Sequence, residues 1–277
     1  MKKVAVIIPT INLWDRFTKP AIESLRSTNN KIAVVLVDNG SIDGTTEGFK
    51  QYGKDHINDG IEFGYIKNTD NVGCSIAWNE GIKFARDEFH PDYYLIINND
   101  VLLNKDAIDN LVDFFEASDG SVVMATMCNL RDGLSVDMVN YPWQQRKDVA
   151  PEEHPDFSGF MISPKCLDEI GWFDEGYSFF GKAYYEDNDY HLRIMLSGLK
   201  AYNVPTAAFY HFGSQSLPHA HTQANINAKY FRAKWGCDSR YENPYKTPFN
   251  NQGNTLKWTW QDSNDHEKEV LKGEVMK

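Results

Sequence analysis

Short apolar runs that stop at polar clusters recur through the first half of the chain. Residues 4–8, 32–37 and 93–97 are rich in Val, Ile, Leu, Ala and Tyr, and each run has the length of one strand. Such runs are typical of strands that are buried on both faces, as in a parallel sheet. Between them, residues 18–27 and 74–87 carry apolar side chains at helical spacing. This alternation predicts an α/β fold with a Rossmann-like, mainly parallel central sheet that is flanked by helices.

The rest of the chain supplies further elements of the same kinds. We expect Asn104 to cap a helix that carries Ile108 and Leu111. Further strands are predicted at residues 61–67, 121–127, 157–162, 199–204 and 209–214, and further helices at residues 164–170, from residue 186 onward, and at 221–236.

The composition limits the possible binding partners and the cellular location of the protein. With 277 residues, of which 42% are hydrophobic, the chain can bury a large core. Its net charge of -11 makes a nucleic acid an unexpected partner, because phosphate backbones bind clustered Lys and Arg. Four widely spaced cysteines suggest neither a zinc site nor a disulfide framework and favour a reducing cytosol. The first apolar run is too short for a signal peptide, and no segment approaches the length of a membrane span, so we expect a cytoplasmic location.

A polar triplet, Asn98, Asn99 and Asp100, directly follows the run at residues 93–97. Open α/β sheets bind ligands beyond the carboxyl ends of their strands, so we expect the turns after residues 8, 37 and 97 to gather along one edge. Carboxylate and amide oxygens suit Mg²⁺ or Mn²⁺, which leave positions open for substrate phosphates. The alternative is a turn in which these side chains bind their own backbone.

A second polar cluster, Glu186, Asp187 and Asp189, marks the start of a predicted helix. Three carboxylates there could simply stabilise the helix N-terminus through its dipole. They could also belong to a site, because a helix N-terminus keeps a carboxylate ionised, and a general base must be ionised at rest.

Eight short motifs follow one another between about residues 3 and 216. They are Ile8-Pro9-Thr10, Val37-Asp38-Asn39-Gly40-Ser41, Asn71-Val72-Gly73, Asn98-Asn99-Asp100, Phe157-Ser158-Gly159, Gly171-Trp172-Phe173-Asp174-Glu175, Glu186-Asp187-Asn188-Asp189 and Tyr210-His211. In this order, the motifs resemble those of the inverting nucleotide-sugar glycosyltransferases of family 2, in particular their rhamnosyltransferase-like branch. This resemblance implies the GT-A fold in one domain, residues 1–236. The nucleotide-sugar-binding half would be residues 1–104 and the acceptor-side half residues 105–236, followed by a C-terminal extension at residues 237–277.

The resemblance also implies an activity and its residues. The enzyme would be metal-dependent and inverting, and would move a sugar from a nucleoside-diphosphate sugar, with UDP or dTDP favoured, to a hydroxyl of a glycan, lipid-linked or other acceptor. Asp100 and His211 would hold Mn²⁺ or Mg²⁺, although the family's acidic triplet commonly begins with Asp where this chain has Asn98. The donor nucleotide would contact Pro9, Thr10, Asn12, Asp38, Asn71, Gly73, Asn98 and Asn99. Asp187 would be the catalytic base, and the acceptor would contact Trp172, Glu186 and Asp189.

Two other functions are compatible with such a sheet. A nucleotidyltransferase typically carries a glycine-rich, basic phosphate loop after the first strand, whereas residues 10–16 contain no glycine. A catalytically inactive sugar-nucleotide-binding relative should have lost Asp100 or Asp187, and both are present.

Three segments leave their roles open in the sequence. Residues 131–156 are expected to be a long loop or acceptor-side flap. Residues 237–277 either wrap the domain or form a tail. The basic residues Lys229, Arg232 and Lys234 would let the helix at residues 221–236 touch the inner face of a membrane peripherally, although a helix that packs on the domain is the more common case.

Overall fold

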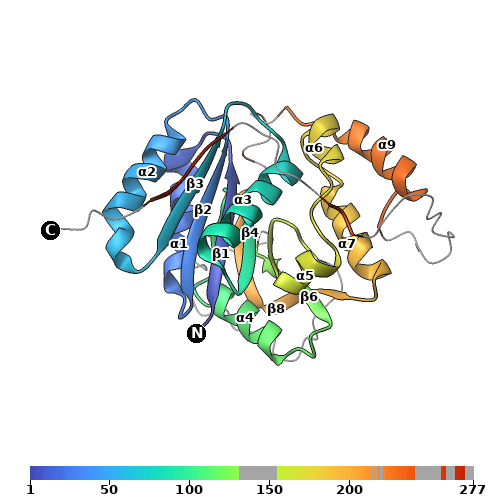
Figure 1. Ribbon diagram of the computed structural model, residues 1–277, viewed down its shortest axis with the longest axis horizontal. Coiled ribbons are helices and arrows are strands. Elements are labelled where there is room, and N and C mark those ends of the chain that lie inside the picture. Colours follow the sequence, from blue (N-terminus) through green and yellow to red (C-terminus); the bar gives the residue numbers. More distant parts are fainter. Residues whose placement is uncertain are drawn as a thin grey trace.

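A nine-stranded mixed sheet forms the centre of the protein in the computed structural model (Figure 1). The structure describes residues 1–130, 155–213, 215, 218, 221–240, 257–259 and 266–271, and the statements below concern these residues. The strands lie in the order β5-β8-β6-β7-β4-β1-β2-β3-β9. The predicted loop at residues 131–156 lies outside the described residues except for its last two positions.

The parallel part of the sheet is the one that the apolar runs predict. β4, β1, β2 and β3 are neighbours in that order and run parallel, so their carboxyl ends meet at one edge. Their bounds are β1 (Lys3–Thr10), β2 (Lys31–Asn39), β3 (Glu62–Asn68) and β4 (Tyr93–Ile97). The predicted mainly parallel α/β sheet is confirmed.

The second half extends the sheet with strands of both directions. β7 pairs antiparallel with β4 and β6, β8 pairs parallel with β6, and β5 pairs antiparallel with β8. Their bounds are β5 (Val101–Leu103), β6 (Val122–Asn129), β7 (Gly159–Ile162) and β8 (Lys200–His211).

The two separate segments predicted at residues 199–204 and 209–214 form the single strand β8. The break in the pattern is a register shift, because Val204 pairs with Met127 while Ala208 already pairs with the next residue of β6. Pro205 begins the extra stretch, and a proline cannot donate to the ladder. The bulge therefore absorbs the irregular residues without ending the strand.

Helices cover both faces of the sheet (Figure 1). One face packs against α1 (Lys19–Ser24), α2 (Thr45–His56) and α4 (Ala107–Ala117), and the other against α3 (Cys74–Phe89), α5 (Pro164–Glu169) and α7 (Glu186–Leu196). The predicted helix at residues 18–27 was wrong in its bounds, since α1 lies between a π-helical turn, Trp14–Thr18, and a 3₁₀ turn, Leu25–Ser27. The predicted cap was also wrong. Asp106 precedes α4, and Asn104 accepts the Asp106 N–H at 3.3 Å.

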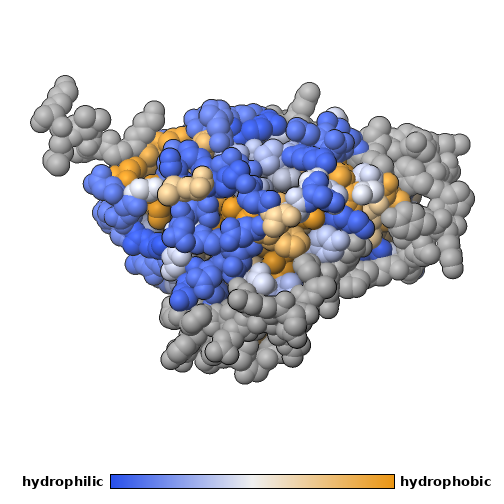
Figure 2. Space-filling model, turned by 90° about the horizontal axis from the view of Figure 1, so that it is seen from below, coloured by the Kyte–Doolittle hydropathy of each residue, from blue (hydrophilic) through white to orange (hydrophobic). Residues whose placement is uncertain are grey.

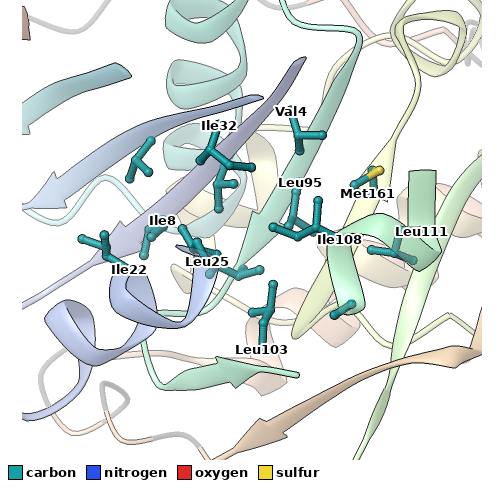
Figure 3. Close-up of a cluster of buried hydrophobic side chains, with 14 of the residues drawn as sticks. Val4, Ile8, Ile22, Leu25, Ile32, Leu95, Leu103, Ile108, Leu111 and Met161 are labelled. Atoms are coloured by element: carbon teal, nitrogen blue, oxygen red, sulfur yellow. The ribbon is translucent and has the colours of Figure 1, made fainter. Parts of the chain in front are cut away.

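The core consists of one apolar cluster on each face of the sheet. In the cluster of Figure 3, Val4, Ile8 and Leu95 from the sheet face Ile22 and Leu25 near α1, and Ile108 and Leu111 of α4 continue the same cluster. Each fully buried side chain of this size contributes roughly 1.5–3 kcal/mol. These clusters fix the helices on the sheet and thereby fix the turns at its carboxyl edge.

Near the C-terminus, β9 (His266–Leu271) pairs antiparallel with β3 (Figure 1). Its Leu271 is buried against the core. Of the two alternatives for residues 237–277, the described residues therefore fit a segment that returns to the domain.

The helix predicted at residues 221–236 is α9 (Ala224–Trp235), which packs on α6 (Gly176–Gly181). Lys234 does not belong to a basic surface, because its side chain is buried and its Nζ lies 2.7 Å from Asp174 and 2.6 Å from Asp189. The packing alternative for this helix therefore holds. The face of the molecule in Figure 2 is largely hydrophilic. Within the described part of the chain, no helix is long and apolar enough to cross a bilayer.

Candidate functional site

A cavity of about 320 Å³ opens at the carboxyl ends of β1, β2 and β4. The turns after residues 8, 37 and 97 gather there, as predicted. Its volume is within the range of small-molecule sites. The lining residues are Pro9, Thr10, Ile11, Asn39, Asn71, Cys74, Trp78, Asn98, Asn99, Asp100, Asp156, Phe157, Ser158, Lys182, Ala183, Tyr184, Glu186, Asp187, His211 and Thr222.

Hydroxyl and amide groups form a buried network behind the mouth of β1. The Nδ2 of Asn99 donates to Thr10 Oγ1 at 3.0 Å and to Thr18 Oγ1 at 3.2 Å, and the two hydroxyls lie 2.9 Å apart. Thr10 and Asn99 line the cavity, and both are nearly fully buried. The network fixes the backbone between β4 and Asp100, so the carboxylate of Asp100 has a defined position.

Asp38 and Asn39 end β2, and the structure separates their roles. Asp38 is 1% exposed and accepts hydrogen bonds from the Ser41 N–H at 2.8 Å and from the Thr46 hydroxyl. It is not among the residues that line the cavity, whereas Asn39 is. Successive residues of a strand point to opposite faces, so only one of the two can face the ligand. The donor-binding role predicted for Asp38 remains a prediction, and the position of Asp38 favours a role in fixing the turn.

A buried chain of polar groups orients Asn39. Asn68 Nδ2 donates both to Glu80 Oε2 at 2.8 Å and to Asn39 Oδ1 at 3.1 Å. Because the Asn68 nitrogen serves the carboxylate, Asn39 must offer its oxygen to that nitrogen, and its own NH₂ is then the group available to the cavity. His266 of β9 lies beside the same carboxylate, with 3.7 Å between its Nδ1 and Glu80 Oε1. The site thus presents an amide donor at the end of β2.

Asn12 and Gly73, which were also predicted to contact the donor nucleotide, do not line the cavity but hold the loops around it. Asn12 joins the loops after β1 and β2, since its Oδ1 accepts the Ile42 N–H at 2.9 Å and its N–H donates to Ser41 Oγ at 2.7 Å. Gly73 has φ +90°, and a Cβ there would lie 2.7 Å from Ser178 and 2.8 Å from the Lys182 carbonyl oxygen. That position requires glycine, because the segment containing Lys182 packs directly on it.

The two predicted metal ligands lie side by side at the cavity. His211 Nε2 is 3.1 Å from Asp100 Oδ1, and the Gln215 N–H donates to Asp100 Oδ2 at 2.9 Å. β5 pairs with β8 so that Val101 lies opposite His211, which brings the two side chains together although they are far apart in sequence. Burial acts to raise the pKa of Asp100, but the hydrogen bonds from His211 and Gln215 outweigh burial and lower it. Asp100 is therefore a carboxylate.

This pair suits a divalent cation that shares its coordination with substrate. A carboxylate oxygen and an imidazole nitrogen are ordinary ligands of Mn²⁺ and Mg²⁺, which are commonly bound through one or two protein groups together with phosphate oxygens. The described residues contain no group of three His, Cys, Asp or Glu side chains placed to hold a metal. Asp100 and His211 thus fit a cation that is completed by a bound diphosphate.

Glu186 and Asp187 begin α7 and also line the cavity. Glu186 is 5% exposed, and burial together with the neighbouring charge of Asp187 raises its pKa from 4.5 to about 8. Asp187 is more open, with 29% of its side chain exposed, and its Oδ2 lies 3.6 Å from the guanidinium of Arg240. Asn188 donates to its Oδ1 at 3.0 Å. Two adjacent carboxyl groups thus have different environments, and such a difference divides acid and base roles.

Asp189 does not reach the cavity. It is fully buried, with Arg193 Nε 2.9 Å from Oδ2, and Lys234 Nζ 2.6 Å and Trp235 Nε1 2.8 Å from Oδ1. Burial acts to raise its pKa, but Lys234 and Arg193 outweigh burial and lower it. These contacts favour a structural role in joining α7 to α9 over the predicted acceptor contact.

Trp172, the other predicted acceptor residue, also lies outside the cavity lining. The guanidinium of Arg86 lies over its ring, 5.0 Å from the ring centre. Its carbonyl oxygen accepts a hydrogen bond from Arg193 at 2.9 Å. Of the three predicted acceptor residues, only Glu186 lies at the cavity.

The structure adds lining residues that sequence reasoning did not select, among them Asn39, Lys182 and Tyr184. Strand alternation past residue 38 could have indicated Asn39. Cys74 lines the cavity as well, but burial raises the pKa of its thiol well above the usual value, and the charges of Glu186 and Asp187 add to this effect. The thiol is thus protonated and unsuited to act as a nucleophile.

The fold and the cavity define an α/β protein with a candidate ligand site at the carboxyl edge of its sheet. This site contains a carboxylate–imidazole pair and two further carboxyl groups. A sequence model described as Glycosyl transferase family 2 matches residues 5–163. The chain belongs to glycosyltransferase family 2.

Relatives and solved structures agree with this assignment. The low-salt glycan biosynthesis hexosyltransferase Agl10 of Haloferax volcanii is 27% identical over 140 residues, which are 46% of this chain and 44% of that protein. The mannosyltransferase PcManGT of Pyrobaculum calidifontis, solved with GDP-Man and Mn²⁺, aligns at 19% identity with a TM-score of 0.56, over 75% of this chain and 56% of that one. S. aureus TarS 1-349 in complex with UDP aligns at 16% identity with a TM-score of 0.54, over 85% and 72% of the two chains. The chain matches about half the length of the first two proteins, and the structural likeness establishes the GT-A fold.

Proposed function

We propose that this protein is a metal-dependent, inverting glycosyltransferase that moves a sugar from a nucleoside-diphosphate sugar to an acceptor hydroxyl. The observation that carries the proposal is that Asp187 lines the same cavity as the Asp100–His211 pair. Single displacement needs a base and a diphosphate-binding pair that both reach one bound donor, because the acceptor must attack the sugar as the diphosphate leaves.

The donor nucleotide would occupy the part of the cavity formed by the ends of β1, β2 and β4, so residues 1–104 would supply the donor half and residues 105–236 the acceptor half. Pro9, Thr10, Asn71, Asn98 and Asn99 line this part. The nucleobase would contact the NH₂ of Asn39. This group is a hydrogen-bond donor, and it complements the ring carbonyl oxygens of uracil or thymine. We therefore expect UDP or dTDP as the donor nucleotide. Guanine also has a ring carbonyl, and the neighbour PcManGT was solved with GDP-Man, so GDP sugars belong in the test.

Asp100 and His211 would hold Mn²⁺ or Mg²⁺, which would supply Lewis-acid neutralisation of the departing diphosphate. In the transfer, Asp187 takes the proton of the acceptor hydroxyl. At the same time, the oxygen of that hydroxyl forms a bond to the anomeric carbon. The bond from that carbon to the diphosphate oxygen breaks, and the nucleoside diphosphate leaves with the electron pair. The anomeric configuration inverts because attack and departure occur on opposite faces.

Arg240 and Asn188 contact Asp187 and limit its rotamers. The guanidinium places a positive charge beside the carboxylate. Glu186, mainly protonated at neutral pH, would donate a hydrogen bond to a sugar hydroxyl.

The acceptor would approach over the segment that leads into α7. Phe179, Phe180 and Tyr184 are exposed there, and Ile226 of α9 is exposed as well. Such a surface suits a sugar ring or the apolar part of a lipid-linked acceptor. A cytoplasmic location, with at most peripheral membrane contact, is part of this proposal.

A donor panel tests the proposal. The protein is incubated with UDP-, dTDP- and GDP-sugars in Mn²⁺, Mg²⁺ or EDTA, and release of the nucleoside diphosphate is measured. We expect turnover of a UDP- or dTDP-sugar that EDTA abolishes. Binding without turnover under all conditions would instead indicate an inactive relative, and turnover unaffected by EDTA would exclude the metal.

A further inference from the structure

We propose that the ammonium group of Lys182 binds the diphosphate of the donor and stabilises the charge that develops on it as it leaves. The inference rests on the proposed function and adds a group that neither the family motifs nor the metal pair include. Lys182 follows α6 and lines the cavity, where its Nζ contacts the carbonyl oxygen of Asn71, a predicted donor-binding residue.

The charges around the cavity give this lysine a special position. Among the lining residues that the structure describes, Lys182 is the sole Lys or Arg, whereas Asp100, Asp156, Glu186 and Asp187 are acidic. A nucleoside diphosphate is an anion, and an acidic cavity would repel it unless cations oppose the carboxylates. Because Asn98 stands where the family commonly has an Asp, the chain also has fewer carboxylates with which to hold a cation. A protein cation beside the metal pair would meet this need.

Its contacts leave the ammonium group free to take a ligand. Lys182 Nζ donates to the Asn71 carbonyl oxygen at 2.9 Å, and in the described part of the chain no carboxylate lies within ion-pair distance of it. An ammonium group has three N–H donors, so two remain. Lysine is well suited to phosphate as a point charge. Because the side chain is partly buried, a donor that covers it would meet the charge in a poorly solvated setting, where the attraction is strong.

The backbone fixes Lys182 at this place. Its carbonyl oxygen accepts the Cys74 N–H at 2.7 Å, at the first turn of α3. Its φ is +68°, and Tyr184 and Tyr185 follow with φ +79° and +73°, a conformation that non-glycine residues adopt at a cost. Strain of this kind persists only where the surroundings hold it.

Asn227 of α9 supplies that support. It is fully buried, and its Nδ2 donates to the carbonyl oxygens of Ala183 at 2.9 Å and Tyr184 at 3.0 Å. The Gln223 N–H binds the Gly181 carbonyl oxygen at 2.8 Å. The segment from Gly181 to Tyr184 is thus pinned from α3 on one side and α9 on the other. Lys182 is presented to the cavity on a fixed backbone, as a ligand-binding group should be.

The experiment compares a nucleoside diphosphate with its nucleoside. Calorimetry measures binding of UDP, dTDP and GDP, and of uridine, thymidine and guanosine, with Mn²⁺ and with EDTA, to wild type, Lys182→Met and Lys182→Arg. Methionine keeps the unbranched Cβ of lysine and most of its length, so the backbone strain at φ +68° is unchanged. Lys229→Met, on the exposed side of α9, is the control for loss of one positive charge.

We expect Lys182→Met to raise the dissociation constant of the bound nucleoside diphosphate by about tenfold or more, with and without Mn²⁺. Lys182→Met should bind the nucleoside and unfold thermally as wild type does. Lys182→Arg should keep part of the affinity for the nucleoside diphosphate, and Lys229→Met should keep all of it. In turnover, kcat of Lys182→Met should fall in addition to a rise in KM, because the charge on the leaving group grows in the transition state.

Equal binding of the diphosphates by Lys182→Met and wild type would overturn the inference. An equal loss for nucleoside and diphosphate would also overturn it, since that pattern indicates a general disturbance of the cavity. If wild type bound no nucleotide at all, the proposed function itself would fail.

Discussion

Replacing Glu186 with glutamine should change how the stability of the protein depends on pH. The side chain lies 5% exposed at the cavity next to Asp187, and its pKa is raised from 4.5 to about 8. The unfolded chain ionises this group near pH 4.5, whereas the folded protein holds it neutral until about pH 8. Below pH 4.5 the group is protonated in both states and costs nothing. Between these values the unfolded state releases a proton that the folded state keeps, so the folded state loses stability as the pH rises.

The size of the effect follows from the two pKa values. One differentially bound proton changes the free energy of unfolding by about 1.4 kcal/mol per pH unit. Between pH 5 and pH 8 the free energy of unfolding should therefore fall by roughly 3–4 kcal/mol, somewhat less than three full units because titration is incomplete at both ends. Glutamine has nearly the same shape and no titrating proton, so Glu186→Gln should lose this dependence.

Urea unfolding at half-unit steps from pH 5 to pH 8.5, followed by tryptophan fluorescence, measures the difference. The stability of Glu186→Gln minus that of wild type should rise steadily to pH 8 and then level off. Glu169→Gln, an exposed carboxylate of α5, should follow wild type at every pH. A difference for Glu186→Gln that does not vary with pH would refute the reasoning, because the carboxyl group would then ionise alike in both states.

Two further predictions concern Asp100 at the cavity and Lys234, which is buried between α9 and α7. Asp100→Ala removes one of the two proposed metal ligands. In Mn²⁺ its dissociation constant for the nucleoside diphosphate, measured by calorimetry, should therefore rise to the wild-type value in EDTA. If Mn²⁺ still strengthened binding to Asp100→Ala, Asp100 would not be a metal ligand. Lys234→Met leaves the buried carboxylates of Asp174 and Asp189 without their shared cation, so it should destabilise the fold by roughly 3 kcal/mol in urea unfolding. The exposed control Lys229→Met should stay within about 0.5 kcal/mol, and equal effects of the two variants would remove the inferred role of the buried pair.

The sheet could be predicted from the sequence because apolar periodicity reports burial directly. The runs at residues 4–8 and 32–37 became β1 and β2 with small changes at their ends. α2 was not predicted, since its Gly48 and Gly53 weaken the helical pattern. Packing requires glycine at position 48, because a Cβ there would lie 2.4 Å from the Trp14 ring. At position 53 a Cβ would lie 2.5 Å from the end of the Leu271 side chain, which would have to move. Tertiary contacts that local propensity cannot register decide such a helix.

The sequence predicted which residue types belong to the candidate site more readily than it predicted which side chains point into the cavity. Asp100 and Asp187 could be singled out as carboxylates at the end of a predicted strand and the start of a predicted helix, whereas His211 was predicted only through the resemblance to family 2. Sequence reasoning could not separate Asp187 from Asp189 without the helix axis. At about 100° per residue, two positions along α7 turn the side chain to the opposite face, where Asp189 meets Arg193.

Other parts of the site depend on contacts between distant segments. Lys182 belongs to the cavity because Asn227 and Cys74 hold its backbone, and neither lies near it in sequence. Asn39 is oriented through Asn68, which is 29 residues away. Hydrogen bonds of this range leave no periodic pattern in the sequence.

The role of Asp187 is the central claim, and sugar transfer by Asp187→Asn tests it most directly. Asparagine keeps the shape and can still accept from Asn188, but it cannot take a proton. Transfer from the donor found in the panel should fall by about a hundredfold or more, while calorimetry should give nucleotide binding close to wild type. Asp119→Asn, an exposed carboxylate that does not line the cavity, should be fully active. Transfer by Asp187→Asn at a rate near wild type would contradict the account, and loss of transfer in Glu186→Gln alone would move the base to Glu186.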